Sequence, residues 1–552
     1  MPTGSDLFVD ALIELGTQEI FTLVGDHLNE VLSVAHRRGL SIYDMRHESG
    51  VAHAADAWAR LHRRPAVSLV TGGPGHTNSL TGIATAYQAC SPLIAISGAP
   101  STALAGRQVF QSIDQVGMAA PVCKWSGAPA SAAQIPYYLG RAYQEATAGR
   151  MGPVHLTIPV NYLEGEVAGA PLPMPRPVGP VRIAPTDAEV DEALGLLSAA
   201  ERPVVIAGSG LWWSDAGHAL ADFLERTRLG YYSVTMARGV LDHGLTYMGY
   251  ADGALNKAIH TAFREADVVL VLGKRVDYRL ALGGPRLFSP TAKFIQVDIH
   301  AQEFGQNRPI DLALCADVRA TLEAMTRRIA PTWPLNEPWL ERQSLLKRQW
   351  MAQLAQSAQD PAEPLHPAAF FAEIERHLPD VTHIAWDGGD FTHWGRATVR
   401  PRGAWLRLGP LGTIGSALPN AFALKLARPD EPVVMFTGDG SLGFYLAELD
   451  TLVRWKTPVV IFVGNDAGWG LERELQGEMQ GSAVACELRA TRYDTIMQGF
   501  GGQGETIRRV EDVAPALARG LAAGVPYLVN VEIRGMRSPF TDWQLGGKAK
   551  KV

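Results

Sequence analysis

Two apolar segments of this chain of 552 residues run into acidic side chains that suit a metal ion. Val433–Phe436 is followed by a Gly-Asp-Gly turn that contains Asp439, and Val459–Val463 is followed by an Asn-Asp pair that contains Asp466. A helical pattern lies between the two segments, as it does between neighbouring strands of a parallel sheet. Carboxylate oxygens from two such strand ends are ligands for Mg²⁺ or Ca²⁺. The spacing therefore predicts a metal site, although an ordinary turn would explain the Gly-Asp-Gly motif alone.

Glycines around these acids favour a phosphate group beside the metal. Gly438 and Gly440 carry no side chain, so the backbone there can approach a bulky anion closely. The carbonyl oxygen of Gly468 would add a third oxygen ligand next to Asp439 and Asp466. The pattern therefore predicts a divalent cation that bridges the protein to a phosphate.

The elements that must position these residues repeat along the chain. Short β-branched segments that end in glycine or proline alternate with amphipathic helical segments, which is typical of parallel sheets covered on both faces. The strand-like segments are EIFTLVG, PAVSLVTGG, PLIAISG, GPVHLTIP, RPVVIAGSG, ADVVLVLG, AKFIQVDI, VTHIAWDGG, PVVMFTGDG, TPVVIFVGND and PYLVNVEI. In such sheets, ligands bind at the carboxyl ends of the strands.

Two proline-rich stretches, Gly169–Pro185 and Ala330–Trp339, divide the chain, because a run of prolines cannot hold a regular helix or a central strand. We therefore expect three consecutive α/β domains, each with a doubly wound parallel sheet, and a C-terminal tail that could act as a lid. Their limits are 1–168, 186–330 and 360–535, with the tail at 536–552.

Composition excludes several classes of protein. An apolar content of 47% and a charged content of 19% are typical of a folded soluble protein. The net charge of -6 argues against a general nucleic-acid binder. Four cysteines without a CxxC pair argue against a disulfide framework or a structural zinc site. The N-terminus resembles an acidic amphipathic helix more than a signal peptide, and no apolar run is long enough to span a membrane. We expect a cytoplasmic enzyme.

The Gly-Asp-Gly turn and the Asn-Asp pair together resemble the signature of thiamine-diphosphate-dependent enzymes of the acetolactate synthase and pyruvate decarboxylase type. Where the family usually has asparagine, this chain has Asp466, which adds a negative charge beside the diphosphate. The segments TGGPGHTNSLTGIATAYQACSPLIAISG and VFQSIDQVGMAAPVCKW also resemble the first domain of the family, so the likeness covers almost the whole chain. It implies a pyrimidine-binding, a central and a diphosphate-binding domain, with thiamine diphosphate and Mg²⁺ as cofactors.

The resemblance assigns a role to Glu48, which follows the strand-like segment Leu40–Met45 and opens a helix. In the family, the matching glutamate hydrogen-bonds N1′ of the cofactor pyrimidine and favours the 4′-imino tautomer, which removes the proton from thiazolium C2. Without the resemblance, an acid at a helix start would be interpreted as a surface residue favoured by the helix dipole.

The segment Gly409–Ala427 resembles the part of the family that supports the pyrimidine. By that match the carbonyl of Gly412 accepts a hydrogen bond from the 4′-amino group, and Ile414 is the wedge that bends the cofactor. The residues that the resemblance expects at the cofactor are Gly388, Gly389, Gly412, Ile414, Gly438, Gly440, Ser441 and Trp469. The metal ligands that it expects are Asp439, Asp466 and Gly468.

Local resemblances narrow the reaction. LVGDHLNEVL, MRHES and the segment from Ala447 to Gly470 resemble benzaldehyde lyase, which has a histidine where His27 falls. By that match His27 exchanges a proton with the substrate hydroxyl, and Gln111 hydrogen-bonds a substrate oxygen. His393, Trp469 and Leu471 are expected to border the substrate pocket. The alternatives are a loop histidine for His27 and core packing for Trp469 and Leu471.

Other segments resemble enzymes that act on coenzyme A (CoA) thioesters. Leu272–Pro309 resembles the central domain of 2-hydroxyacyl-CoA lyases and oxalyl-CoA decarboxylases, and the C-terminal RSPFTDWQLGGKAKKV resembles the tail of the former. Ser209, however, stands where CoA-dependent relatives tend to have lysine. The candidate phosphate-binding residues are Arg275, Arg279, Arg537, Lys548, Lys550 and Lys551. An ordinary charged surface is the alternative, and FAD or ADP in the central domain stays open.

We therefore expect a thiamine-diphosphate-dependent lyase that cleaves 2-hydroxyacyl-CoA to an aldehyde or ketone plus formyl-CoA, and that runs backwards as an acyloin-type carboligase. The alternatives are a 2-hydroxy ketone lyase that resembles benzaldehyde lyase, an acetolactate synthase or oxalyl-CoA decarboxylase, and a catalytically silent relative. Because the family joins the first domain of one chain to the third domain of another, the resemblance also implies a homodimer or homotetramer. We expect no nucleic-acid or membrane partner.

Overall fold

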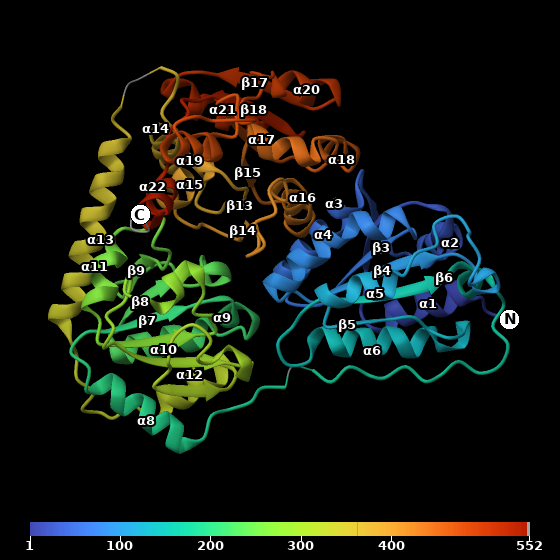
Figure 1. Ribbon diagram of the computed structural model, residues 1–552, viewed down its shortest axis with the longest axis horizontal. Coiled ribbons are helices and arrows are strands. Elements are labelled where there is room, and N and C mark those ends of the chain that lie inside the picture. The colour runs from blue at the N-terminus through green and yellow to red at the C-terminus, as the bar shows by residue number, and fades with distance from the viewer. Residues whose placement is uncertain (180, 361–362, 549–552) are drawn as a thin grey trace.

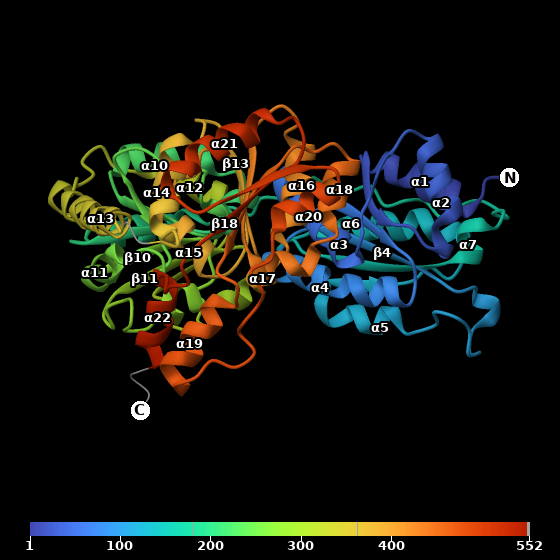
Figure 2. The same ribbon diagram turned by 90° about the horizontal axis from the view of Figure 1, so that it is seen from above.

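The computed structural model describes residues 1–179, 181–360 and 363–548 (Figure 1). It contains three six-stranded sheets, one after another along the chain. All the paired strands of the sheets are parallel, and helices flank each sheet (Figures 1 and 2). The prediction of three consecutive doubly wound α/β domains is confirmed. The predicted domain limits stay predictions, but each sheet lies within one of them.

The N-terminal sheet has the strand order β2-β1-β3-β4-β6-β5. Strand β3 is buried at all of its positions, because helices cover both faces of the sheet. The strands are β1 Glu19–Leu23, β2 Ser41–Asp44, β3 Ala66–Val70, β4 Leu93–Ala99, β5 Trp125–Gly127 and β6 Val154–Pro159. The helices are α1 Gly4–Glu14, η1 Asp26–Leu28, α2 Asn29–Arg37, α3 Glu48–His62, α4 Pro74–Ala89, η2 Thr102–Leu104, α5 Gln115–Ala119, η3 Ala120–Val122, η4 Ala132–Gln134, α6 Ile135–Thr147 and α7 Val160–Glu164.

The central sheet has the order β12-β11-β10-β7-β8-β9, and its core strands β7 and β10 are fully buried. The strands are β7 Pro203–Ala207, β8 Gly230–Ser233, β9 Tyr247–Tyr250, β10 Val268–Leu272, β11 Lys293–Asp298 and β12 Leu312–Cys315. The helices are α8 Asp187–Ser198, α9 Ser209–Trp213, α10 Gly217–Thr227, η5 Thr235–Ala237, α11 Ala258–Glu265, η6 Tyr278–Gly283, η7 Ala301–Glu303, α12 Val318–Arg328 and the connecting α13 Glu337–Ser357.

The C-terminal sheet has the order β14-β13-β15-β16-β18-β17. Its strands are β13 His383–Trp386, β14 Trp405–Arg407, β15 Val433–Gly438, β16 Val460–Asn465, β17 Gln503–Ile507 and β18 Tyr527–Glu532. The helices are α14 Pro367–His377, α15 Asp390–Thr398, α16 Ala417–Ala427, α17 Asp439–Leu442, η8 Gly443–Tyr445, α18 Glu448–Arg454, α19 Gly470–Gln480, α20 Tyr493–Gly499, η9 Val510–Asp512, α21 Val513–Ala522 and α22 Pro539–Lys548.

Helix α3 joins the N-terminal domain to the C-terminal domain. Helix α16 packs against α3, and one continuous apolar core contains residues of both helices. Their many alanines let the two backbones approach closely. On the neighbouring α4, Thr85 Oγ1 lies 2.8 Å from Thr413 Oγ1 of the C-terminal domain. Glu48, the first residue of α3, is therefore held by both domains.

The second proline-rich stretch is irregular only as far as Asn336, so the prediction that all of Ala330–Trp339 is irregular was wrong. Helix α13 begins at Glu337 and has Pro338 in its first turn, where the missing N–H group is tolerated. The Asn336 side chain caps this helix by accepting the N–H of Trp339. The first stretch, Gly169–Pro185, forms no helix or strand in its described residues.

Six strands did not stand out in the sequence, namely β5, β8, β9, β12, β14 and β17. All but β8 lie at the edge of a sheet. An edge strand is short and partly exposed, so it lacks the continuous apolar run that marks a buried parallel strand. Strand β12, for example, alternates buried and exposed residues. Among the described residues, no helix is long and apolar enough to span a membrane.

Candidate active site

The predicted metal acids lie at the carboxyl ends of β15 and β16, which are neighbours in the C-terminal sheet. They line a cavity of about 160 Å³ whose described lining residues all lie between 367 and 536. Eleven residues singled out from the sequence line this cavity, namely Gly388, Gly389, Ile414, Gly438, Asp439, Gly440, Ser441, Asp466, Gly468, Trp469 and Leu471. The fold therefore brings together at one edge what the sequence holds in four separate segments.

Glycine is required in the wall of this cavity. A Cβ atom built on Gly440 would lie 2.7 Å from ring atoms of Trp469, so any side chain there would displace the tryptophan. Gly389 has φ +88° and Gly412 has φ +77°, a region that favours glycine. Gly412 itself does not line the cavity among the described residues, but it lies in the same loop as Ile414.

Asp387 organises three of the turns that surround the cavity, a role that the sequence did not reveal. Its carboxylate accepts the N–H of Gly388 at 2.8 Å and the N–H of Gly415 at 2.9 Å. The hydroxyl of Thr437 donates to it at 3.2 Å. Complete burial raises the pKa of Asp387 to about 6. One buried carboxylate thus fixes the turns after β13 and β15 and the loop before α16.

The two metal acids lie in the same buried space. The Asp439 carboxylate accepts the N–H of Gly440 at 2.9 Å and the N–H of Gly468 at 3.1 Å, which fixes its orientation. Burial and the nearby Asp466 carboxylate raise the pKa of Asp439 to about 7. Burial raises the pKa of Asp466 to about 6. Asp439 is buried and Asp466 is partly buried. Two carboxylates in one cavity that both resist ionisation favour a divalent cation between them.

Arg473 compensates for the aspartate that replaces the family's asparagine. Its guanidinium nitrogen Nη2 donates to Asp466 Oδ2 at 2.6 Å. Gly535 lies against this guanidinium, and a Cβ atom at that position would lie 2.3 Å from Arg473 Nη2. The arginine can therefore lie here only because residue 535 is a glycine. The extra negative charge at Asp466 is therefore paired within the protein, and its second oxygen stays available for a metal.

The N-terminal candidates lie around one glycine-rich turn, Gly72 to Gly75, which follows β3 and includes the first residues of α4. A Cβ atom on Gly72 would lie 3.2 Å from the His27 ring, and one on Gly73 would lie 2.9 Å from Gln111. A Cβ on Gly75 would lie 3.5 Å from Glu48 Oε1. His27, Gln111 and Glu48 come from three distant segments, and the turn brings all of them together.

Hydrogen bonds define which ring nitrogen of His27 carries the proton. The backbone N–H of Gly72 donates to His27 Nδ1 at 3.2 Å, and Thr71 Oγ1 lies 2.9 Å from the same atom. Nδ1 is therefore the acceptor, and Nε2 carries the hydrogen of the neutral ring. Burial lowers the pKa of His27, so the neutral form predominates at neutral pH. The side chain thus presents one N–H donor.

Two glutamines support this turn in different ways. Gln111 has φ +62°, which is strained for a residue with a side chain, and its Oε1 is buried without a hydrogen-bond partner among the described residues. Gln115, which the sequence did not single out, is fully engaged. Its Oε1 accepts the N–H of Gly73 at 2.9 Å and its Nε2 donates to Gly98 O at 3.0 Å. Gln115 therefore fixes the turn, whereas Gln111 has an oxygen free for a ligand.

Glu48 is half-buried at the start of α3, and Asn78 Nδ2 donates to its Oε2 at 2.9 Å. Glu48, His27 and Gln111 are not among the described residues that line the cavity of Asp439 and Asp466. In the described chain, the candidate residues therefore form two separate groups.

His393 does not line the metal cavity, so its role at the substrate stays a prediction. Its ring is buried and stacks on Phe540 of α22, with 4.1 Å between the ring centroids. The neighbouring Asp390 accepts hydrogen bonds from the hydroxyls of Ser538 and Thr541, at the start of the same helix. Asp390 thus holds the C-terminal helix in place, which explains an acid near an expected diphosphate.

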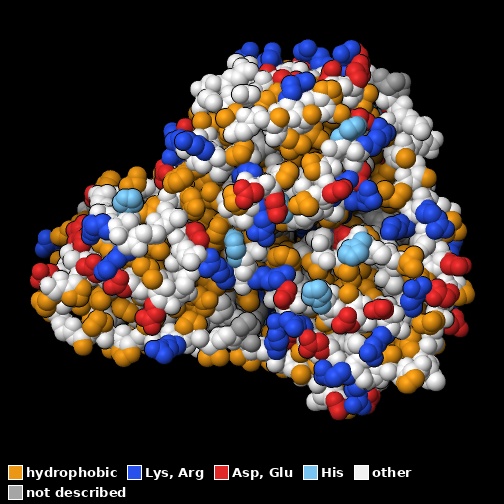
Figure 3. Space-filling view, turned by 180° about the vertical axis from the view of Figure 1, so that it is seen from behind, with side chains coloured by type: hydrophobic (Ala, Val, Ile, Leu, Met, Phe, Trp, Pro, Cys, Tyr) orange, Lys and Arg blue, Asp and Glu red, His pale blue; other side chains and the backbone are white. Residues whose placement is uncertain are grey.

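The predicted phosphate-binding residues separate into different sites. Arg275 lines a second cavity of about 650 Å³ between the N-terminal and central domains, whereas Arg537 pairs with Glu474 and Glu478 on α19. Lys and Arg side chains gather at the hollow where the N-terminal domain meets the rest of the chain (Figure 3). Lys550 and Lys551 lie outside the described residues, as does the side chain of Lys548.

Arg279 belongs to a buried group of arginines between the central and C-terminal domains, together with Arg396 and Arg407. Arg279 pairs with Asp252 at 2.7 Å, and Arg407 Nη1 donates to Tyr250 Oη at 3.2 Å. The Nε of Arg396 is buried without a hydrogen-bond partner in the described chain. Burial and the nearby Arg407 lower the pKa of Arg396 to about 9. We call these three residues the arginine cluster.

The C-terminal half fits thiamine diphosphate and a divalent cation. Its glycine-rich wall leaves room for phosphate oxygens, the two acids supply hard ligands, and Ile414 borders the same cavity.

Comparison with known proteins identifies related sequences along the whole chain. Three domains of the thiamine pyrophosphate enzymes match: the N-terminal TPP binding domain at residues 2–118, the central domain at 190–325 and the C-terminal TPP binding domain at 387–531. A probable acetolactate synthase of Mycobacterium bovis is 35% identical and aligns with 94% of this chain and 93% of its own. The 2-hydroxyacyl-CoA lyase 2 of Homo sapiens is 32% identical and aligns with 96% of this chain and 89% of its own.

The pKa values of the two metal acids predict how metal binding depends on pH. Because Asp439 and Asp466 are protonated below about pH 6 to 7, Mg²⁺ must displace protons there. We expect the affinity for Mg²⁺, titrated calorimetrically in the presence of thiamine diphosphate, to rise by at least ~10-fold from pH 6 to pH 7. The rise should be smaller in Asp466→Asn, the matched control. Equal pH dependence in the two proteins would contradict the assignment.

The stability of the folded protein should depend on pH through the same two acids, Asp439 and Asp466. Their folded-state pKa values lie above the ordinary 3.8, so their contribution to stability is fully present below about pH 4 and is lost as the pH rises through 6 and 7. The metal-free protein should therefore lose melting temperature over this range relative to Asp439→Asn. Mg²⁺ should restore more of it at pH 8 than at pH 6.

Proposed function

This chain belongs to the thiamine pyrophosphate enzyme family, and from that premise we propose that it is a Mg²⁺-dependent carbon–carbon lyase for 2-hydroxyacyl-CoA. The products are an aldehyde or ketone and formyl-CoA, and the reverse reaction is an acyloin-type ligation. Asp439, Asp466 and the carbonyl of Gly468 hold the metal, and the glycine turns beside them hold the diphosphate.

Bound thiamine diphosphate supplies a nucleophilic carbon and an electron sink for the cleavage of a bond next to a carbonyl. Glu48 holds a proton at a carboxylate oxygen and shares it with the cofactor pyrimidine. The bond that breaks joins the thioester carbonyl carbon to the carbon that bears the hydroxyl. The hydroxyl oxygen becomes the carbonyl of the released aldehyde or ketone, and the thioester carbon gains a proton.

The substrate side of the site orients these proton transfers. Because the Gly72 N–H occupies Nδ1 of His27, the neutral ring presents its Nε2–H group to the substrate. This group donates a hydrogen bond to the hydroxyl oxygen and stabilises the negative charge that develops there as the proton is lost. The unpartnered Oε1 of Gln111 accepts a hydrogen bond from the same hydroxyl. Trp469 and Leu471 cover the cavity wall and exclude water from the reacting carbon.

The observation that carries the choice of a CoA thioester is the arginine cluster. Three buried guanidinium groups lie near one carboxylate, that of Asp252, and the Nε of Arg396 has no partner among the described residues. A buried cation without a counter-ion is costly, and a guanidinium suits a phosphate because it donates in a planar fork. Arg396 lies in α15, seven residues beyond Gly389 of the cofactor cavity, or ~10 Å along a helix.

The larger cavity between the N-terminal and central domains is a second place for phosphates. Arg150, Arg182 and Arg275 are among the cations that line it. Leu408 to Pro410 form part of its wall, and the same loop continues to Ile414 at the cofactor cavity. A nucleotide there would lie one loop away from the reacting centre.

The relatives favour two candidate reactions. The names of the relatives include 2-hydroxyacyl-CoA lyase 2 at 32% identity, which supports the leading proposal, and acetolactate synthase at 35%, which supports a second. His27 and Gln111 side by side at one turn favour a hydroxy-bearing substrate over pyruvate, because they supply a donor and an acceptor for a hydroxyl. A 2-hydroxy ketone lyase without CoA shares this feature and lacks only the phosphates.

We further propose that two copies of the chain complete each active site. In this arrangement, Glu48 of one chain faces the cavity that contains Asp439 and Asp466 in the other chain. The described lining residues of that cavity include none from the N-terminal domain of the same chain. Exposed apolar side chains lie close in sequence to both groups of candidate residues. Val24 and Phe110 lie near His27 and Gln111, and Leu411 and Phe444 lie near Ile414 and Ser441. Such residues are typical of an interface.

Substrate specificity tests the proposal directly. We expect formyl-CoA from 2-hydroxyisobutyryl-CoA or another 2-hydroxyacyl-CoA, and little turnover of pyruvate or benzoin. Acetolactate from pyruvate as the dominant product would favour the second candidate instead. Cleavage of benzoin with no reaction of any thioester would indicate the ketone lyase.

Arg396→Gln should raise the KM for the thioester by about 10- to 100-fold with little change in kcat, because it removes a charged hydrogen-bond donor to phosphate. Arg275→Gln is the matched variant in the larger cavity. A raised KM only in Arg275→Gln would place the CoA phosphates there, and an unchanged KM in both would remove the argument for CoA.

Subunit complementation tests the shared active site. Glu48→Gln and Asp439→Asn should each keep only a small residual activity as homo-oligomers. Co-expression should restore about one quarter of wild-type activity, because half of the dimers are mixed and each contains one intact site. No recovery in a verified mixed dimer would show that each chain completes its own site.

A further inference from the structure

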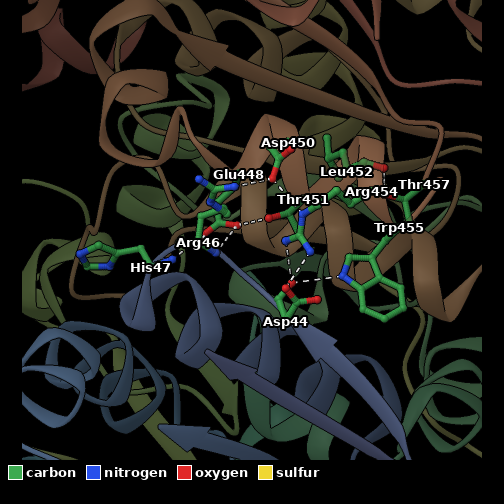
Figure 4. A network of polar contacts seen from close by, with 10 residues as sticks. All are labelled: Asp44, Arg46, His47, Glu448, Asp450, Thr451, Leu452, Arg454, Trp455 and Thr457. Atoms are coloured by element: carbon green, nitrogen blue, oxygen red, sulfur yellow. Dashed lines mark hydrogen bonds and ion pairs between the residues drawn. The ribbon is translucent and has the colours of Figure 1, made fainter. Parts of the chain in front are cut away.

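Glu448 is a buried carboxylate with no place in the chemistry described so far. It lies at the start of α18 and is 2% exposed. It accepts the backbone N–H of Arg46 at 3.1 Å and the N–H of His47 at 3.1 Å, across the boundary between the C-terminal and N-terminal domains. Thr451, one turn further along α18, also donates its hydroxyl to this carboxylate. These contacts are drawn in Figure 4.

The two N–H groups belong to the residues immediately before Glu48. His47 is the N-cap of α3, and Glu48 is its first residue. N–H groups at a helix start have no partner within the helix, so an anion placed there binds them strongly. The carboxylate of Glu448 is that anion, and it fixes the backbone from which the Glu48 side chain projects.

A glycine in α3 leaves space for the Glu448 carboxylate. A Cβ atom on Gly50 would lie 2.7 Å from Glu448 Oε1, so only glycine at this helical position admits the carboxylate. Ser49 Oγ and Tyr445 Oη lie 2.7 Å apart, which makes a second link to the same turn. The first turn of α3 is thus seated on the segment from Tyr445 to Glu448.

Other contacts hold the segment that precedes Glu48 in the chain. Arg454 pairs with Asp44 at the end of β2, and the Trp455 ring N–H donates to Asp44 O at 3.1 Å. Arg46 pairs with Asp450 at 2.9 Å, but this arginine is 51% exposed, so that ion pair is screened by water. Among the side chains of the described residues, Glu448 is the one that binds the backbone N–H groups of Arg46 and His47 from a buried position.

We propose that Glu448 is a positioning residue for Glu48, and that it ties each cofactor-activating glutamate to the metal-binding turn of its own chain. Asp439 and Glu448 lie in one continuous run of short helices, α17, η8 and α18. Under the two-chain arrangement proposed above, Glu48 serves the cofactor of the partner subunit, whereas Asp439 holds the cofactor of its own. Glu448 therefore links the two active sites of a dimer through backbone contacts. This inference rests on the proposed role of Glu48.

Glu448→Gln tests the inference, because the amide keeps the shape but presents an NH₂ group or a weaker acceptor to two N–H donors. We expect kcat to fall by about 10- to 100-fold, since small misplacements of a catalytic group have effects of this size. KM and the affinity for thiamine diphosphate, followed by quenching of tryptophan fluorescence, should change by less than about twofold. Hydrogen exchange at the amides of Arg46 and His47 should become faster in the cofactor-free protein.

Asp450→Asn is the matched control, because it removes a charge from the same network without touching the backbone next to Glu48. It should change kcat by less than about twofold. Combining Glu448→Gln with Glu48→Gln should cost no more activity than Glu48→Gln alone, because a residue that acts through another adds nothing once that residue is gone. Additive losses, or an unchanged kcat in Glu448→Gln, would overturn the inference.

Two further comparisons distinguish a failure of the proposed role of Glu48 from a failure of the proposed role of Glu448. If Glu48→Gln itself retains most of the wild-type activity, the proposed function of Glu48 fails, and the inference fails with it. If Glu448→Gln does not fold, Gly50→Ala takes its place, because its new Cβ presses on the same carboxylate. A fully active, folded Gly50→Ala protein would then overturn the inference, and a loss of kcat with normal cofactor binding would support it.

Discussion

Buried carboxylates that accept backbone N–H groups are the constraint on which the arrangement of this protein depends. Turns that follow parallel strands leave N–H groups without partners in the sheet, and buried N–H groups must be satisfied. Asp387 satisfies two turns around the cofactor cavity, Asp439 satisfies a third, and Glu448 satisfies the start of α3. Each carboxylate is costly to bury alone. It is tolerated because several donors converge on it, and the same donors are thereby locked in place.

This constraint explains how a single chain carries two well-ordered, separate groups of candidate residues. The glycine turns of the C-terminal domain form a cavity for a diphosphate and a metal, while the turn Gly72 to Gly75 gathers His27, Gln111 and Glu48. Helix α3 packs on α16, so the N-terminal and C-terminal domains of one chain are joined firmly. The two-chain arrangement proposed above would bring these two groups together, because a second copy presents the same two surfaces in the opposite order.

Charge pairing differs between Asp439 and Asp466 and the arginine cluster. At the metal acids, Arg473 neutralises the aspartate that replaces the usual asparagine, so the departure from the family pattern is balanced locally. In the arginine cluster, the positive charges are not all paired. Arg279 pairs with Asp252, whereas the Nε of Arg396 has no hydrogen-bond partner among the described residues. A ligand phosphate would supply the missing charge. The uneven distribution of buried charge is thus more informative about the substrate than the fold, which the whole family shares.

The sequence by itself determined the three successive parallel sheets, the position of Asp439 and Asp466 at the ends of neighbouring strands, and the glycine turns around them. These depend on local patterns: buried parallel strands are continuous apolar runs, and turns that approach a ligand need glycine. It also pointed to Glu48, though only through resemblance. Tertiary structure alone decided the roles of Asp387, Gln115, Arg396, Arg473 and Glu448. Nothing in their local sequence distinguishes them from ordinary polar residues, because their partners lie tens to hundreds of residues away, or within reach only once the chain has folded. Whether a buried charge is paired depends on those distant neighbours, and only the assembled fold places them side by side.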